Sequence, residues 1–160
     1  MAGKKDPTRR LRWINWWPPF LAMGIRVTRM ADDLRAIDVE MRLLRRNTNY
    51  VGVHFGGSLY AMADPFFMLM LMHNLGPGYQ VWDKAATIRF RRPGKGTVRA
   101  QFRLTEAELE DIQSKLATQE KYEPVFTAEI KDAEGNVVAE VEKLLYVRRK
   151  EAKRGLRPTS

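Results

Sequence analysis

The stretch from Asn49 to Asp64 reads NYVGVHFGGSLYAMAD, and it joins a polar, glycine-containing loop to a long apolar segment. One carboxylate, that of Asp64, lies inside this apolar segment. A carboxylate in apolar surroundings is costly unless it is paired, hydrogen-bonded or protonated. Asp64 is therefore the first candidate for a functional residue.

The apolar segment continues from Gly56 to Asn74, and it has no polar face at helical spacing. A helix that is apolar all round is buried on all sides. Gly76, Pro77 and Gly78 end the segment. We therefore expect one long helix in the centre of the molecule.

Strand patterns flank this helix on both sides. Apolar and polar residues alternate in two segments before it and in four segments after it, which is typical of half-buried antiparallel strands. The segments are centred on residues 25–28, 37–43, 86–90, 98–104, 126–130 and 137–141. No regular alternation of strands and helices is present, so a doubly wound parallel sheet is not expected. We expect an α+β protein in which about five to six antiparallel strands curve around one buried helix.

Two further helices are predicted. Asn15 is expected to cap a helix that continues to Met23, with Pro18 and Pro19 in its first turn and Gly24 as its end. Its tryptophans indicate either a cover for one end of the core or an anchor in a membrane interface. Thr105 and Glu108 form a capping box for a second helix.

The composition limits the classes of protein and site. The 160 residues suit one domain, expected at 13–149 between flexible basic termini at 1–12 and 150–160. The chain has no cysteine, and its two histidines do not suggest a metal site. The net charge of +9 favours anionic partners. No secretory signal or membrane span is visible, so we expect a soluble, cytoplasmic protein.

The spacing of Asn49, the glycine pair Gly56–Gly57 and Asp64 resembles the motif of hotdog-fold acyl-CoA thioesterases. In one branch of that family, an asparagine and a loop ending in His-Gly-Gly precede an aspartate on the central helix. The resemblance covers roughly residues 25–147, and it extends to a thioesterase-like subgroup of largely unknown function. One difference is that Phe55 stands where the family has its histidine, and His54 lies one residue earlier.

The resemblance implies a hotdog fold and the hydrolysis of an acyl thioester, with no cofactor and no metal. Asp64 is the implied general base or nucleophile, the Gly56 amide the implied oxyanion donor, and Asn49 the implied orienting group. The residues implied to bind the substrate are Gly57, His54, Ser58, Asp83, Arg89, Arg91 and Arg92. The arginines suit the phosphates of coenzyme A, or they form a solvated face. The family's polar residues meet across a subunit interface, which implies a homodimer or a dimer of dimers.

Alternatives remain open for several residues. Asp64 before Pro65 is also the pattern of a helix N-cap. Asn49 alone is typical of a turn, and His54 alone is typical of a buried core residue. Ser58 lacks the G-x-S-x-G motif of serine hydrolases.

Two other functions compete with hydrolysis. One is a non-catalytic acyl-binding or acyl-carrier-binding protein of the same fold, which the displaced histidine favours. The other is a basic protein that binds nucleic acid or a membrane surface. The first choice remains an acyl-CoA thioesterase that binds acyl-CoA or another acyl thioester. It implies no nucleic-acid partner and no stable membrane insertion.

Overall fold

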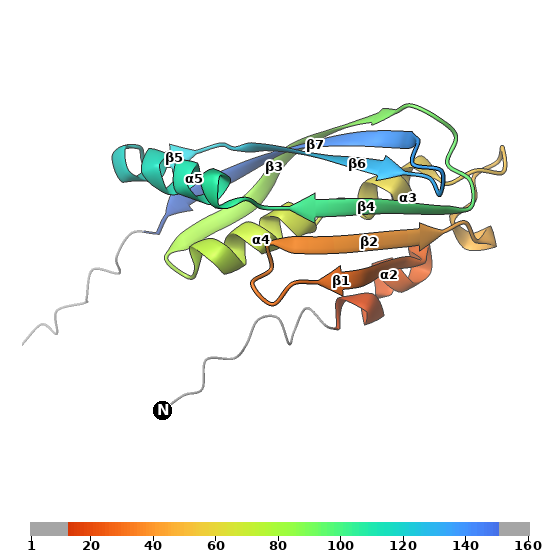
Figure 1. Ribbon diagram of the computed structural model, residues 1–160, viewed down its shortest axis with the longest axis horizontal. Helices are drawn as coiled ribbons and strands as arrows, with labels where there is room; N and C mark the ends of the chain where they lie inside the picture. The colour runs from red at the N-terminus through yellow and green to blue at the C-terminus, as the bar shows by residue number, and fades with distance from the viewer. Residues whose placement is uncertain (1–12, 151–160) are drawn as a thin grey trace, which may run out of the picture.

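Alternating apolar and polar residues form seven strands of one antiparallel sheet in the computed structural model, which describes residues 13–150 (Figure 1). The strands are β1 (Ile25–Met30), β2 (Ala36–Arg42), β3 (Tyr79–Phe90), β4 (Thr97–Arg103), β5 (Lys121–Tyr122), β6 (Val125–Lys131) and β7 (Val137–Arg149). Their order in the sheet is β1-β2-β4-β6-β7-β3, and the short β5 pairs with β7. The expected curved antiparallel sheet is confirmed, with the two-residue β5 as an additional strand.

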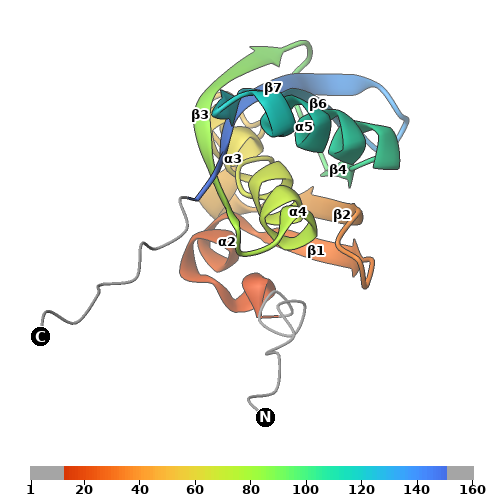
Figure 2. The same cartoon turned by 90° about the vertical axis from the view of Figure 1, so that its left-hand side faces the viewer.

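The sheet curves around a central helical segment, as the end-on view in Figure 2 shows. Alternate residues of the middle strands point to this concave side because successive side chains in a strand face opposite sides. Examples of these buried residues are Val39 and Met41 on β2, Val98 and Phe102 on β4, and Ile130 on β6. The core therefore lies between the sheet and the helices.

The central segment consists of two helices, α3 (Gly56–Ala61) and α4 (Phe66–Leu75), and not of the single long helix expected from the sequence. Pro65 accounts for the break, because a proline ring clashes with the carbonyl group four residues earlier, here that of Ala61. Pro65 occupies the N-cap position of α4, and no side chain caps this helix. The N-cap interpretation of Asp64 is therefore wrong.

A row of phenylalanine rings joins α4 to the sheet. The ring of Phe66 lies 4.8 Å from that of Phe102, measured between centroids, and Phe67 stacks on Phe126 at the same distance. On its other side Phe66 contacts Phe20, at 6.0 Å. Such aromatic pairs add about 0.5–1.5 kcal/mol each beyond the burial of their surface. They hold the central helix in register with β4 and β6.

The N-terminal segment also differs from its expected form. A 3-10 turn, η1 (Ile14–Trp16), precedes the short helix α2 (Pro18–Met23). Asn15 does not cap a helix. Its side chain donates to the carbonyl oxygen of Val27 and accepts from the Val27 amide, at 3.0 and 2.7 Å, so it fixes the segment to β1. Gly24 ends α2 with a φ of 72°, as expected.

Two apolar side chains, one on α4 and one on β3, are more exposed than the sequence suggested. Met72 on α4 is exposed, although a helix buried on all sides was expected. The strand β3 begins at Tyr79, earlier than expected, and lies at an edge of the sheet. Its last residue, Phe90, is 55% exposed, although strand alternation placed it on a buried face. No further strand lies beside β3 among residues 13–150, so Phe90 at its end is left uncovered.

The remaining elements close the ends of the sheet. The helix α5 (Glu106–Thr118) begins with the expected capping box, in which Thr105 and Glu108 bond reciprocally. A second 3-10 turn, η2 (Arg45–Asn47), leads into the Asn49 loop. None of the described helices is long and apolar enough to cross a membrane. Of the expected flexible segments, 1–12 lies outside the described residues, and so does 150–160 apart from Lys150, which bonds to the carbonyl oxygens of Pro77 and Gly78.

Candidate functional site

Asp64 belongs to a cluster of charged groups at the break between α3 and α4. The ammonium group of Lys143, on β7, lies 3.0 Å from Asp64 Oδ1 and 3.1 Å from Asp83 Oδ2. The hydroxyl of Tyr60, on α3, donates to Asp64 Oδ1 at 3.0 Å, and Lys143 donates to the Tyr60 oxygen at 3.3 Å. The structure therefore brings together two residues predicted from the sequence, Asp64 and Asp83, through two that were missed.

The strand β7 explains how a lysine comes to be buried. Its odd-numbered residues from Ala139 to Val147 face the core, and Lys143 is the one charged member of that series. Lys143 has no exposed side-chain surface, whereas the side chain of Asp64 is 45% exposed. The sequence already indicated that Lys143 is buried, because alternation along β7 places it between the inward-facing Val141 and Leu145.

The pKa shifts in this cluster follow from one ammonium being shared by two carboxylates. Burial lowers the pKa of Lys143, but its hydrogen bonds and charge interactions with Asp64 and Asp83 outweigh burial, so that its pKa is raised. Burial raises the pKa of Asp83, and its bond to Lys143 offsets this only in part. Burial also raises the pKa of Tyr60. Lys143 and Tyr60 therefore both keep their protons at neutral pH.

Two carboxylate oxygens of the cluster accept no hydrogen bond from any residue in the described part of the chain. The bonds to Asp64 from Tyr60 and from Lys143 both end on Oδ1, which leaves Oδ2 without a donor. Asp83 Oδ1 is buried and has no partner among residues 13–150. A buried acceptor without a partner is unfavourable. Oδ2 of Asp64, on a half-exposed carboxylate, can therefore accept a proton or a hydrogen bond from a bound molecule, whereas Oδ1 of Asp83 is closed off from solvent.

A second set of predicted residues lies around a pocket at the start of α3. Asn49, His54 and Gly56 line a cavity of about 380 Å³ together with Arg91 and Arg92. Asn49 is held by its own loop, because its Oδ1 accepts from the amides of Val51 and Val53 at 3.1 and 3.2 Å. The side-chain oxygen of Asn49 therefore stabilises a turn, which is the role that is typical of an isolated asparagine. Its amide nitrogen donates to no residue of the described chain.

Gly56 allows a close contact at the mouth of this pocket. A Cβ atom at Gly56 would lie 2.9 Å from the ring of Phe90, so the glycine lets the end of β3 approach α3. The amide groups of the first turn of a helix have no partner inside the helix. Gly57 is exposed, and a Cβ atom there would meet the ring of Phe55. Since α3 has only six residues, the local amides matter more than any helix dipole.

His54 and Ser58 make structural contacts. His54 is buried, and its Nε2 lies 3.0 Å from the carbonyl oxygen of Gly96. Burial lowers the pKa of His54, so the imidazole is neutral. The hydroxyl of Ser58 donates to the carbonyl oxygen of Phe55 at 2.7 Å. No group of three or more metal-type ligands occurs in the part of the chain that is described.

The predicted arginines do not lie together. Arg91 and Arg92 line the Asn49 pocket, and Arg91 also forms a salt bridge of 2.7 Å with Glu140. Arg89 instead lines a separate hollow that includes Glu129 and Glu142. A phosphate in the Asn49 pocket would therefore meet Arg91 and Arg92, whereas Arg89 faces acidic side chains elsewhere.

Asp64 and the Asn49 pocket belong to opposite ends of α3. Asp64 follows Gly56 by eight positions in the chain, which corresponds to about 12 Å along a helix. Reacting groups must approach to about 3–3.5 Å. Neither Asp64 nor Asp83 lines the pocket that contains Gly56. Within one chain, a thioester carbonyl could not contact the Gly56 amide and Asp64 at the same time.

Comparison with solved structures shows the same architecture in other proteins. A Pseudomonas aeruginosa protein of unknown function named "Probable Thioesterase" has a TM-score of 0.78 and 23% identity, over 90% of this chain and 97% of that one. A Haemophilus influenzae thioesterase has a TM-score of 0.65 and 18% identity, over 91% and 93% of the two chains. The Escherichia coli PaaI protein, from a phenylacetic acid degradation operon, has a TM-score of 0.63 and 21% identity, over 92% and 95%. At these identities the likeness confirms the hotdog fold.

The sequence also matches a family model. The model described as a domain of unknown function, DUF4442, matches residues 10–147, which is most of the chain. No curated protein matches the sequence. The resemblance to thioesterase-like hotdog proteins is thereby confirmed. The chain belongs to the DUF4442 family of hotdog-fold, thioesterase-like proteins.

Proposed function

We propose that this protein hydrolyses an acyl thioester, with Asp64 as the catalytic carboxylate. One observation carries the proposal. Tyr60 and Lys143 hold Oδ1 of Asp64 while Oδ2 of the same half-exposed carboxylate has no donor among the described residues. A carboxylate fixed on one oxygen and open on the other suits a general base or a nucleophile. The thioesterase names of the structures with this fold agree with this chemistry.

In the proposed reaction, Oδ2 of Asp64 takes a proton from a water molecule whose oxygen attacks the thioester carbonyl carbon. The C–S bond then breaks, and the departing thiolate takes up that proton from Asp64, so that the free acid and the thiol are the products. In the alternative, Oδ2 attacks the carbonyl carbon directly, the thiolate leaves, and water hydrolyses the resulting anhydride between the acyl group and Asp64. The N–H group of Gly56 donates a hydrogen bond to the carbonyl oxygen as negative charge develops on it. The free amide group of Asn49 orients the carbonyl group or the water. Lys143 acts as a positioning residue, because its ammonium bonds to Oδ1 of Asp64 and fixes the carboxylate in place.

The two ends of α3 become one site when two copies of the chain associate. β3 is an edge strand, and the small residues Ala85, Ala86 and Thr87 on it are exposed. An unpaired strand edge is a template for pairing with another chain. If β3 pairs antiparallel with β3 of a second copy so that the two Thr87 residues lie opposite each other, Asp83 of one chain comes level with Arg91 of the other, which lines the Gly56 pocket. The proposed site then combines the Asp64 cluster of one chain with the Gly56 pocket of its partner.

Coenzyme A is the proposed carrier because of the charge of the pocket. Arg91 and Arg92 line it beside Asn49 and Gly56, and no carboxylate lines it. The phosphates of coenzyme A are multiply anionic, and guanidinium groups bind phosphate with two parallel hydrogen bonds. The exposed ring of Phe90 adds an apolar wall to the same pocket, which suits an acyl chain.

The experiment that tests the proposal measures thiol release from short, long and aromatic acyl-CoA esters. The Asp64→Asn variant should lose at least about 10²-fold in rate, as expected for the loss of a general base. Asp32→Asn is the matched control, because Asp32 is exposed in the turn between β1 and β2. The chain has no cysteine that would add to the colour reaction. Turnover that survives in Asp64→Asn would remove Asp64 from the mechanism.

A second candidate function is the binding of an acyl group or acyl carrier without hydrolysis. The position of His54 favours it, since the imidazole is buried against the carbonyl of Gly96 and the exposed ring of Phe55 stands where the resembling thioesterases have histidine. Native mass spectrometry of the purified protein distinguishes the two. A retained acyl ligand with no turnover of any ester would favour binding, whereas turnover would exclude a purely binding role.

A further inference from the structure

We propose that one face of this protein docks onto a membrane surface that contains anionic phospholipids. The face, called here the tryptophan–arginine face, consists of Trp13, Trp16, Trp17, Leu21, Arg26, Arg42 and Arg46. It is formed by η1 and α2, the start of β1, the end of β2 and η2. The inference is independent of whether the protein hydrolyses thioesters.

The tryptophans of this face point away from the core. Trp13 and Trp16 are each 68% exposed and Trp17 is 47% exposed, although all three lie in a segment that packs firmly on the protein. The packing is provided by Phe20, which is buried, and by the two hydrogen bonds from Asn15 to Val27. Large exposed apolar groups that are held in place mark an interaction surface.

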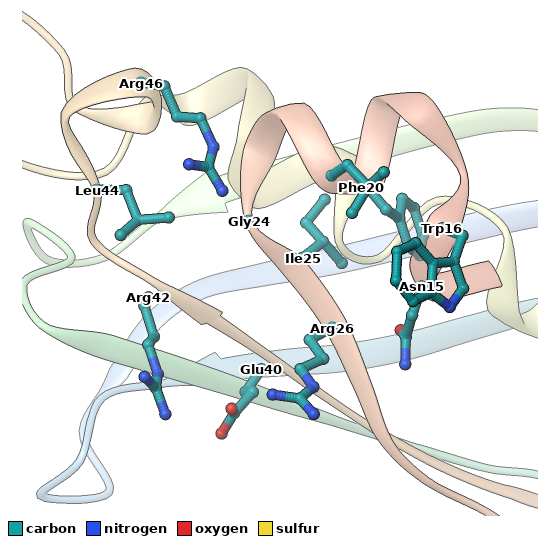
Figure 3. Close-up of a pocket in the computed structure, with 11 residues that line it drawn as sticks. Asn15, Trp16, Phe20, Gly24, Ile25, Arg26, Glu40, Arg42, Leu44 and Arg46 are labelled. Carbon is teal, nitrogen blue, oxygen red and sulfur yellow. The ribbon is translucent and has the colours of Figure 1, made fainter. Parts of the chain in front are cut away.

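Arginines line a groove beside these tryptophans. The groove has a volume of about 380 Å³, and Trp16 and Leu21 line it together with Arg26, Arg42 and Arg46. Figure 3 shows the guanidinium groups of the three arginines, which come from different elements, around this groove. Their shared position concentrates positive charge next to the indole rings.

These three arginines form no salt bridge with any carboxylate among residues 13–150. The acidic residue of the groove, Glu40, has its carboxylate 3.8 Å from Arg99 on β4. Elsewhere on the sheet, Arg91 and Arg103 bond to Glu140 and Asp38 at 2.7 and 2.6 Å. The face therefore carries positive charge that its own carboxylates do not neutralise, and it is complementary to an anionic surface.

The sequence carries further positive charge directly before Trp13. The twelve residues that precede Trp13 include Lys4, Lys5, Arg9, Arg10 and Arg12, with Asp6 as the one acidic residue. Clusters of basic residues beside an amphipathic segment are typical of binding to acidic lipid headgroups.

The chemistry of the face fits a lipid surface better than nucleic acid. Tryptophan favours the boundary between water and acyl chains because its ring is apolar and its N–H group is polar. Leu21, Pro18 and Pro19 are also exposed here, and they add apolar surface that acyl chains can cover, whereas stacking of bases would use the aromatic rings alone. Arginine binds phosphate groups at the same depth. No described helix can span the bilayer, so the proposed docking is peripheral.

The test is flotation of the full-length protein with lipid vesicles in about 0.1 M salt, where charge is screened over about 10 Å. Vesicles of phosphatidylcholine alone are compared with vesicles that also contain phosphatidylglycerol. We expect binding to the second kind only. Arg26→Gln/Arg42→Gln/Arg46→Gln should weaken this binding by at least about tenfold, since each basic residue near the surface contributes several-fold. Trp13→Ala/Trp16→Ala/Trp17→Ala should weaken it as well.

The matched control for charge is Lys115→Gln/Lys121→Gln/Lys131→Gln, which removes the same three charges from α5, β5 and β6. It should bind nearly as well as the unchanged protein. Equal loss in the arginine and lysine variants would overturn the proposal, because net charge alone would then explain the binding. Absence of binding to anionic vesicles would also overturn it. Release of the protein from vesicles by a short single-stranded oligonucleotide, with tighter binding to that oligonucleotide, would indicate nucleic acid instead.

The matched control for the indoles is Trp82→Phe, which changes the tryptophan that stacks on Tyr146 of β7 and lies outside the face. In this variant, brominated lipids should still quench the tryptophan fluorescence. In the variant that lacks Trp13, Trp16 and Trp17, they should not quench the remaining Trp82. Quenching of Trp82 alone would place the membrane contact at β3 and would overturn the assignment to this face.

Discussion

Lys143 Nζ lies 3.0 Å from Asp64 Oδ1, and this contact joins the last strand of the sheet to the break in the central helix. The two residues are 79 positions apart in the chain. The lysine is fully buried, whereas the aspartate reaches solvent. The buried ammonium group of Lys143 therefore holds the half-exposed carboxylate of Asp64 in a fixed orientation.

Lys143→Met should destabilise the protein by about 3 kcal/mol, because removal of one partner leaves Asp64 and Asp83 as neighbouring carboxylates without an ammonium. Methionine fills much of the space of the lysine stem, so the loss reports mainly the charge. Denaturant unfolding at neutral pH measures the change in the free energy of unfolding. A change below about 0.5 kcal/mol would contradict a structural role for this cluster.

The control is the double variant Lys143→Met/Asp83→Asn. It removes the ammonium together with the more buried of the two carboxylates, so part of the lost stability should return. Residues in direct contact show non-additive effects, here expected to exceed about 0.5 kcal/mol. Strict additivity of the two single changes would mean that Lys143 and Asp83 do not interact.

The pH dependence of stability should carry the signature of Asp83. Burial raises its pKa in the folded protein above the value in the unfolded chain, which is about 3.9. Between these two pKa values the folded state binds more protons, so the free energy of unfolding decreases as the pH rises through that window. Asp83→Asn cannot ionise and should lack this decrease. Unfolding curves of both proteins at closely spaced pH values above 4 test this, and parallel profiles would contradict it.

Strand periodicity predicted the middle of the sheet well and its edge poorly. β2 and β4 each bury one face, so the alternation at Ile37, Val39 and Phe102 was informative. The alternation that places Phe90 on a buried face was misleading. Phe90 ends β3, which is an edge strand, and no neighbouring strand packs beside it on the outer side. The break before α4 could have been anticipated from Pro65, whose steric effect on the preceding turn is local.

The candidate site was predictable only in part because its members are far apart in the chain. Asn49, Gly56 and Asp64 lie within one short stretch and could be related by spacing. The strand pattern of β7 places Lys143 on the buried face, which is unusual for a lysine. Only the fold, however, shows that its partner is Asp64. Periodicity shows which side a residue faces, but it does not show which distant residue it meets there.

Gly56→Ala should separate activity from stability. The added Cβ atom would lie 2.9 Å from the tip of the Phe90 ring, which is exposed and can move aside. The free energy of unfolding should therefore change by less than about 1 kcal/mol, the range of the helix propensity difference between glycine and alanine. The displaced ring would narrow the Asn49 pocket, so thioester turnover should fall at least about tenfold.

Two variants control this prediction. Gly78→Ala adds the same atom in open space, and neither stability nor turnover should change. Gly56→Ala/Phe90→Ala removes the colliding ring and should recover part of the turnover lost in the single variant. A lack of recovery would show that the methyl group at position 56 acts directly on the substrate and not through Phe90.

Thr87→Lys should weaken the association that the proposed site requires. Thr87 is exposed near the middle of β3, so two copies paired there would place two lysines close to each other across the interface. Like charges directly opposite each other destabilise paired strands. Sedimentation analysis should show a shift toward monomer, and turnover should fall in proportion to the lost dimer. Thr28→Lys makes the same change on β1, the other edge strand, and should leave both unchanged. Full turnover by a monomeric Thr87→Lys protein would show that one chain carries the whole site, and it would contradict the proposed union of the Asp64 cluster with the partner's Gly56 pocket.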